Sequence, residues 1–280
     1  MPATAFLFPG QGAQTPDAAP LVRRHAADLL ATCIAALGED PLPRCDESTR
    51  FAQPAIVLAS LAGWRAAGAT EAAAFAGHSL GELSALAAAG ALDEHDAVRL
   101  SVLRGSLMAA EAAAQGDGTM LALLGGTIED AHGIALAHGL TIANDNAPGQ
   151  VVLSGPRGAI DGARRAARDE GLRALELDVS GAFHSPAMAP AIEQFALALA
   201  NVDWRAPSAP VISGLTAEPF SDPARELAGA VVAPVRWREV MRALHALGIE
   251  RYVDAGPGRV LERLVDRNLK GASDAVGARS

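Results

Sequence analysis

The chain has few lysines and few cysteines, and each shortage excludes a class of chemistry. Lys270 is the only lysine, so a mechanism based on a Schiff-base or phosphate-binding lysine is close to excluded. The two cysteines, Cys33 and Cys45, have neither C-x-x-C nor metal-ligand spacing, which predicts no disulfide framework and no zinc site. Because no cluster of His, Cys or carboxylate residues has ligand spacing, we expect neither a metal nor an organic cofactor.

The sequence also lacks long apolar runs and an excess of positive charge. Its N-terminus has no basic region followed by a long apolar stretch, and no later run of about 18 or more apolar residues is free of charge. We therefore expect no export, no membrane span and a cytoplasmic location. The net charge of -9 argues against general nucleic-acid binding, which needs clustered Lys and Arg.

The chain does contain enough apolar residues for a large core. Half of its 280 residues are hydrophobic and 20% are charged, a composition that excludes intrinsic disorder. A chain of this length forms either one α/β domain or a main body with a smaller inserted unit.

Apolar periodicity outlines an α/β body. Residues 4–8 predict a buried strand that ends at Pro9-Gly10, and residues 73–77 predict a second short strand. Apolar residues recur at helical spacing over 21–37 and 55–67. The last third of the sequence predicts two more helices and two more strands, over 190–199, 237–247, 211–213 and 251–254. We expect a hydrolase-like, mostly parallel sheet flanked by helices.

The order of predicted elements changes between residues 119 and 179. It becomes strand, helix, two strands, helix and strand, and this βαββαβ order is the ferredoxin-like pattern. It predicts a small subdomain over 118–182, inserted into a large subdomain formed by 1–117 and 183–280.

A candidate nucleophile lies between the second strand and an alanine-rich helix. Residues 77–81 read GHSLG, a G-x-S-x-G pattern in which small residues permit a strained strand-to-helix turn that exposes the serine. Ser79 also lies at a helix N-terminus, where N–H groups favour a developing oxyanion. The alternative is a glycine-flanked serine that only caps the helix. The strand, the helix and a second glycine-rich loop at residues 10–12 favour the nucleophile.

A serine hydroxyl needs a base, which is usually a histidine. His184 lies in SGAFHSP, a glycine-containing loop that follows the last strand of the inserted unit, and we predict that it is the base. His78 adjoins the serine, but neighbouring side chains on such a turn diverge, which favours a structural role. The other histidines fall on polar faces or ends of predicted helices and are interpreted as surface residues: His25, His95, His132, His138 and His245.

A series of short motifs follows one order along the chain. They are FPGQGAQ at 8–14, QPA at 53–55, GHSLGE at 77–82, RGxxM at 104–108, NAPGQ at 146–150, GAFHS at 181–185, PVxW at 234–237 and GPGxVL at 256–261. With these motifs the chain resembles the malonyl-CoA:acyl carrier protein transacylases and the polyketide acyltransferase domains from end to end.

The resemblance implies a ping-pong reaction in fatty acid or polyketide biosynthesis. Ser79 would attack malonyl-CoA to form an ester, and His184 would accept the serine proton. The main-chain N–H groups of Gln11 and Leu80 would hold the oxyanion. The phosphopantetheine thiol of a holo acyl carrier protein would then take the malonyl group. An acidic carrier would need a local basic patch on this chain, and the resemblance makes a monomer the default.

The resemblance also implies a set of substrate-binding residues. Arg104 would bind the free carboxylate of malonate through its planar guanidinium. Without its motif, Arg104 would be interpreted as a surface arginine on a helix. Phe183 is similar to the residue of malonyl-selective acyltransferases, whose ring crowds the α-methyl group of methylmalonate, an effect on the order of 1 to 3 kcal/mol. Gln53 and Asn146 are assigned substrate-binding roles by their motifs.

Two features depart from the pattern of the fatty-acid enzymes. Their catalytic histidine is oriented by the main-chain carbonyl of a residue that is often glutamine, and Arg236 occupies that position here. Because a backbone group does this work, Arg236 is still predicted to orient His184. The stretch between residue 12 and residues 53–54 also looks shorter, which puts the choice of carrier protein in doubt.

Three other functions stay open. One is the malonyl transferase subunit of a malonate decarboxylase, which uses the same motifs. A second is a serine acyl hydrolase, in which water resolves the acyl enzyme; Arg104 and the lack of an obvious acidic third residue argue against it. A third is a catalytically idle binding module, which the intact Ser79 and His184 disfavour.

Overall fold

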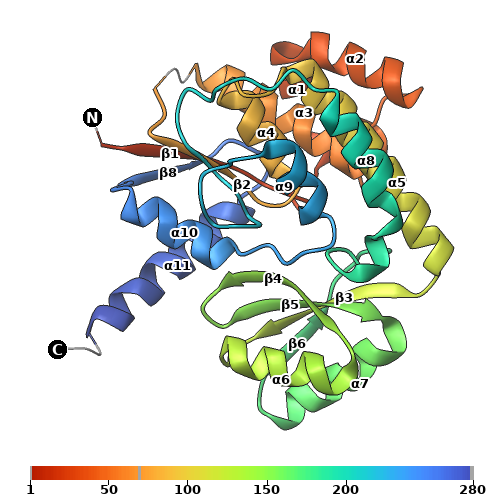
Figure 1. Ribbon diagram of the computed structural model, residues 1–280, viewed down its shortest axis with the longest axis vertical. Helices are drawn as coiled ribbons and strands as arrows, with labels where there is room; N and C mark the ends of the chain where they lie inside the picture. Colours follow the sequence, from red (N-terminus) through yellow and green to blue (C-terminus); the bar gives the residue numbers. More distant parts are fainter. Residues whose placement is uncertain (1, 69–70, 278–280) are drawn as a thin grey trace.

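Short apolar runs form a parallel sheet at the centre of the larger part of the molecule (Figure 1). The computed structural model describes residues 2–68 and 71–277, with side chains as far as residue 270. The sheet has the strand order β7-β2-β1-β8, and all three pairings are parallel. Its strands are β1 (Thr4–Phe8), β2 (Ala74–Gly77), β7 (Val211–Ile212) and β8 (Arg251–Asp254).

Helices cover both faces of this sheet because successive side chains of a strand point to opposite faces. Phe6, Phe8 and Phe75 belong to the core under the larger helical layer, whereas Leu7 and Ala76 belong to a second core with the last two long helices. The larger layer contains α1 (Ala19–His25), α2 (Ala27–Leu37), α3 (Thr49–Ala67), α4 (Gly81–Ala88), α5 (Glu94–Gln115), α8 (Pro190–Ala200) and α9 (Pro223–Ala230). The second layer contains α10 (Trp237–Ala246) and α11 (Val260–Gly277). The predicted parallel sheet flanked by helices is confirmed.

The helix predicted over 21–37 is wrong in one respect, because it is divided in two. At Ala26 the backbone leaves the helical region, with φ -143° and ψ 36°, and the residue is fully buried between α1 and α2. Short 3-10 turns occur in the connections at Pro16–Ala18, Leu42–Arg44 and Pro186–Met188.

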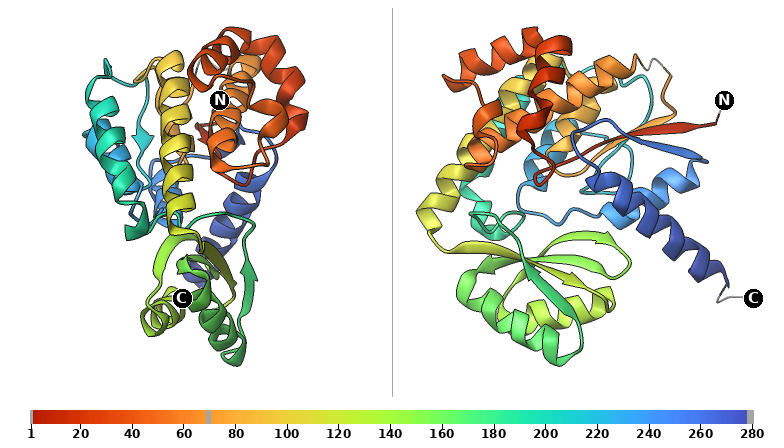
Figure 2. Two further views of the ribbon diagram at one scale, coloured as in Figure 1. Left: turned by 90° about the vertical axis from the view of Figure 1, so that its right-hand side faces the viewer. Right: turned by 180° about the vertical axis from the view of Figure 1, so that it is seen from behind.

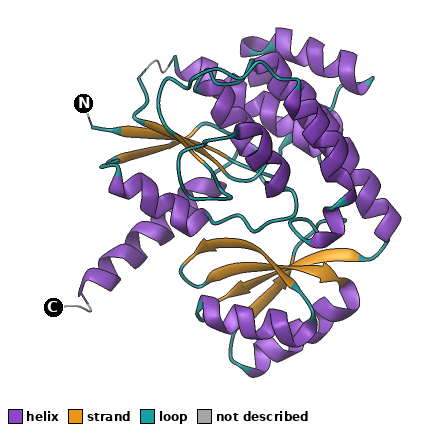
Figure 3. Cartoon of the chain, in the orientation of Figure 1, coloured by secondary structure: helices purple, strands orange, loops and turns teal. Residues whose placement is uncertain are grey.

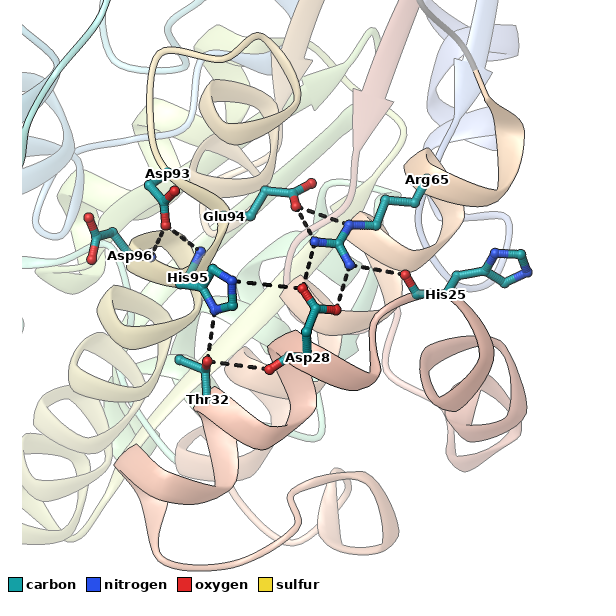
Figure 4. A network of polar contacts seen from close by, with 8 residues as sticks. All are labelled: His25, Asp28, Thr32, Arg65, Asp93, Glu94, His95 and Asp96. Carbon is teal, nitrogen blue, oxygen red and sulfur yellow. Dashed lines mark hydrogen bonds and ion pairs between the residues drawn. The ribbon is translucent and has the colours of Figure 1, made fainter.

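A polar network joins three helices of the larger layer (Figure 4). Arg65 of α3 donates two hydrogen bonds to Asp28 of α2, at 2.7 and 3.0 Å, and its Nε donates to Glu94 of α5 at 3.0 Å. His95, also on α5, makes a 2.8 Å hydrogen bond with Thr32 of α2. The guanidinium therefore links the ends of α2, α3 and α5 at one point.

A second, antiparallel sheet forms a separate layer that we call the β3–β6 unit (Figure 3). Its strand order is β4-β5-β3-β6. The strands are β3 (Gly118–Leu124), β4 (Thr141–Ala147), β5 (Gln150–Pro156) and β6 (Arg173–Glu176), with α6 (Ile128–His138) and α7 (Arg157–Asp169) packed on one face. The elements follow the order predicted from the sequence. A separate ferredoxin-like subdomain bounded at 118 and 182 stays a prediction.

Two connections join the two layers, one at each end of the β3–β6 unit (Figure 2). The long helix α5 leads directly into β3, and the chain after β6 returns through the segment that carries His184 to α8. Within the described residues, no helix combines the length and apolarity that crossing a bilayer requires.

Candidate active site

Ser79 lies on a sharp turn between β2 and α4. Its backbone has φ 53°, in the left-handed region that residues other than glycine seldom occupy. A Cβ atom on Gly77 would lie 2.1 Å from the Glu82 nitrogen, and one on Gly81 would lie 2.0 Å from the Phe8 oxygen. Glycine is therefore required on both sides, and the strained turn predicted from the G-x-S-x-G pattern is present.

The predicted base lies next to the predicted nucleophile. The Oγ atom of Ser79 is 2.7 Å from Nε2 of His184, although the two residues are 105 positions apart in the sequence. His184 is buried and also has a positive φ, 57°. The fold thus brings the strand-to-helix turn and the return loop from the β3–β6 unit to one point.

Two main-chain carbonyls fix the other side of the His184 ring. Nδ1 lies 2.9 Å from the oxygen of Ala230, the last residue of α9, and 3.1 Å from that of Ala233. Because both oxygens can only accept, we assign the proton to Nδ1, which leaves the Nε2 lone pair to accept from Ser79. The negative end of the α9 dipole also favours positive charge on this ring.

The prediction that Arg236 orients His184 is therefore wrong. The carbonyl of Arg236 accepts the N–H groups of Glu239 and Val240 in the first turn of α10, and its own N–H donates to Gly214. Its backbone groups are thus occupied by the helix and by the neighbouring loop. Main-chain carbonyls carry no side-chain signature, so no motif could have identified Ala230 and Ala233.

Burial keeps the histidine neutral. Burial, with smaller contributions from the positive charge of Arg104 and from the His78 ring, lowers the pKa of His184 to about 3, although the two carbonyls act in the opposite direction. At neutral pH the ring is therefore an unprotonated acceptor. This is the form that a general base requires before the reaction.

A buried guanidinium faces the serine from α5. Arg104 donates from Nη1 to Gln53 Oε1 at 2.8 Å and from Nη2 to Ser79 Oγ at 3.1 Å. Both partners are neutral, and Arg104 makes no ion pair with a described residue. Burial lowers its pKa to about 10, and the charge of Glu82 opposes that shift. Arg104 therefore remains a cation at neutral pH with capacity for an anionic ligand.

These residues line a cavity of about 430 Å³. Its apolar wall consists of Met108, Met120, Leu177, Val179 and Phe183. Gln11 and Leu80 also line the cavity, and within the described chain neither of their main-chain N–H groups donates a hydrogen bond. Both groups are thus available to an oxyanion at Ser79.

Two predicted substrate-binding residues do not line the cavity. Gln53 is buried behind Arg104, which it orients. Asn146 accepts a 2.8 Å hydrogen bond from Nε2 of His78 instead. Asn144, two residues earlier on β4, lines the cavity, and it was not predicted from the sequence. Residues two positions apart on a strand share a face, so the prediction for Asn146 could have extended to Asn144. No group of three or more metal-ligating side chains occurs among the described residues.

Comparison with known proteins places this site in a family. A family model described as an acyl transferase domain matches residues 36–280. The chain belongs to the acyl transferase domain family.

Relatives of this acyl transferase include a malonyl CoA-acyl carrier protein transacylase and a polyketide biosynthesis protein. It is 37% identical to the malonyl CoA-acyl carrier protein transacylase of Escherichia coli K12, over 94% of this chain and 92% of that protein. It is also 37% identical to the polyketide biosynthesis protein ThaF of Burkholderia thailandensis, over 98% of this chain but 25% of that much longer protein. A solved complex of a type II PKS acyl-carrier protein with its malonyl-transacylase (PlMCAT:AntF) has a TM-score of 0.85 and 32% identity, over 96% of this chain and 93% of that chain.

Proposed function

We propose that this acyl transferase moves a malonyl group from malonyl-CoA to the phosphopantetheine thiol of an acyl carrier protein, in fatty acid or polyketide biosynthesis. The observation that carries the proposal is the buried cation of Arg104, 3.1 Å from the nucleophile and free of any ion pair with a described residue. An acyl group that ends in a carboxylate matches this cation. The relatives' names and the complex with a carrier protein support the donor and the acceptor.

The first half-reaction forms an ester on Ser79. Its Oγ attacks the thioester carbonyl while Nε2 of His184 takes the hydroxyl proton. The negative oxygen of the tetrahedral intermediate accepts from the N–H groups of Gln11 and Leu80. The intermediate then collapses, the C–S bond breaks, and the leaving thiolate takes the proton from Nε2.

The second half-reaction runs the same steps with another thiol. Nε2 of His184 takes the proton of the phosphopantetheine thiol, and the sulfur attacks the ester carbonyl. When the C–O bond breaks, the Ser79 oxygen recovers that proton, and the malonyl thioester leaves on the carrier. The carbonyls of Ala230 and Ala233 hold the Nδ1 proton throughout, so one tautomer serves both halves.

Arg104 gives the reaction its selectivity for malonate. Its fork of donors suits a carboxylate, and an acetyl group would leave the buried cation without a partner, which is costly. Phe183 and the other apolar wall residues limit the room beside the malonyl α-carbon. Ser79, His184 and Arg104 all belong to this chain and meet without a partner's help, and we propose that a monomer suffices for activity.

The test is intact-mass spectrometry after incubation with malonyl-CoA. We expect a malonyl adduct on the wild type and on Ser106→Ala, a control serine of α5 that hydrogen-bonds within its helix, but none on Ser79→Ala. The adduct should pass to a holo acyl carrier protein and stay when the apo carrier is supplied. An adduct that water removes equally fast without a carrier would identify a hydrolase, and no adduct at all would identify an idle module.

A further inference from the structure

The outer edge of β4 is paired with a segment of the larger part of the molecule. β4 is an edge strand of its own sheet. Beyond it lies Val235, whose N–H donates to Ala143 and whose carbonyl accepts from Asp145, both at 2.9 Å. The β3–β6 unit is therefore joined to the segment 233–236 by main-chain hydrogen bonds.

The same segment holds the catalytic histidine. The carbonyl of Ala233 accepts from His184 at 3.1 Å, and the N–H of Arg236 donates to Gly214 at 2.9 Å. Only Pro234 separates Ala233 from Val235, and its ring fixes φ, which makes this link stiff. A displacement of β4 along its edge therefore moves one of the two carbonyls that hold His184.

A largely buried ion pair joins β4 to α10. Arg238, in the first turn of α10, places Nε 2.9 Å and Nη2 2.7 Å from Oδ2 of Asp145, and the two side chains are 20% and 12% exposed. The other carboxylate oxygen, Oδ1, is buried with no hydrogen-bond partner among the described residues. A buried ion pair whose hydrogen-bonding capacity is only partly used adds little to the free energy of unfolding. Its better attested role is to specify one arrangement of the elements that it joins.

We infer that Asp145 and Arg238 are a positioning pair for the transfer reaction: by fixing β4 against the segment 233–236, they hold the Ala233 carbonyl on His184. Neither residue lines the cavity or touches the reacting atoms. The inference about rates rests on the proposed function, whereas the geometry of the histidine ring can be measured without any substrate.

The rate test compares Asp145→Asn, Arg238→Gln and the double variant with Arg267→Gln. The control removes an exposed 2.8 Å contact between α11 and Gln150, also on the β3–β6 unit, but leaves the segment 233–236 untouched. We expect the rate of Ser79 malonylation to fall by roughly 10- to 100-fold in the single variants, because small displacements of a catalytic group have effects of this size. The KM for malonyl-CoA and the control should change less than about twofold. The double variant should be no slower than the slower single variant, because one pair is removed in each case.

The second measurement is ¹⁵N NMR of the histidine rings in the folded proteins, with His184 assigned from a His184→Ala spectrum. The wild type and Arg267→Gln should show a single His184 tautomer protonated at Nδ1, and the pair variants a mixture of tautomers. Variants that lose thermal stability but keep this tautomer and the wild-type malonylation rate would overturn the inference. If the wild type takes no malonyl group, the proposed function fails, and the tautomer spectra still decide the role of the pair.

Discussion

Ser79 Oγ lies 2.7 Å from His184 Nε2. Both residues have a left-handed backbone conformation, with φ 53° and 57°, which residues other than glycine seldom adopt. Such a conformation costs about 1 to 3 kcal/mol per residue and persists only where the surroundings impose it. Here the surroundings are the close-packed glycines beside Ser79 and the carbonyls of Ala230 and Ala233 on the His184 ring. The strain lies on the two groups that exchange a proton.

Replacing His184 by alanine should remove the base and leave the fold intact. We expect the rate of Ser79 malonylation to fall by about 10² to 10⁴, the usual contribution of a general base. The measurement is quench-flow mass spectrometry together with circular dichroism. His95→Ala, a half-exposed histidine in the network of Figure 4, is the matched control and should keep the wild-type rate. Equal losses in both variants would point to a general folding defect.

Replacing Arg104 by glutamine should change which acyl group is accepted. The variant loses two charge-assisted donors to the malonyl carboxylate, so kcat/KM for malonyl-CoA should fall by about 10² or more. Acetyl-CoA makes no such contact and should lose far less. Competition between the two thioesters gives the ratio directly. Arg99→Gln, on the same helix but paired with Asp96 at the surface, should leave the ratio unchanged.

The burial of His184 predicts an unusual dependence of kcat/KM on pH below neutrality. Because burial lowers its pKa to about 3, the free enzyme should not lose its base between pH 7 and pH 5, and kcat/KM should not show a His184 limb near pH 6.5. The unfolded chain, in contrast, protonates this histidine near pH 6.5, so stability should rise with pH between about 3 and 6.5. His184→Gln should lack this part of the slope in urea titrations. A kcat/KM limb near pH 6.5 that His184 variants abolish would contradict the assignment.

Asp28→Asn should weaken the junction of α2, α3 and α5. The Arg65 guanidinium lowers the pKa of Asp28 from 3.8 to about 2. The pair therefore adds stability above pH 3.8 that is lost as the pH falls through 2. Because half of the Asp28 side chain is exposed, screening limits the loss at pH 7 to about 0.5 to 1 kcal/mol. Urea unfolding at pH 7 measures it, and Asp203→Asn, in a far more exposed pair, should show no change.

Side-chain patterns account for what the sequence predicted. Glycines at 77 and 81 predict the turn that exposes Ser79, and short apolar runs predict strands of both sheets. The pairing of Ser79 with His184 and the place of Arg104 were expected from the family's motifs, and the structure brings all three together.

Contacts made by the backbone were beyond prediction. The two carbonyls that hold His184 belong to alanines whose side chains take no part in these contacts, and the expectation for Arg236 failed because its carbonyl accepts from the first turn of α10. Asn146 carried the motif, but the cavity is lined by Asn144. The break at Ala26 likewise falls inside an unbroken apolar pattern.

The pairing of Val235 with β4 also bears on how the protein behaves when it is stressed. While the pairing holds, the N–H and C=O groups on the outer edge of β4 are satisfied within the molecule. Any condition that parts the β3–β6 unit from the segment 233–236 leaves an unprotected strand edge, which readily pairs with another chain. Mild denaturant or warming should therefore produce strand-rich aggregates before either sheet unfolds.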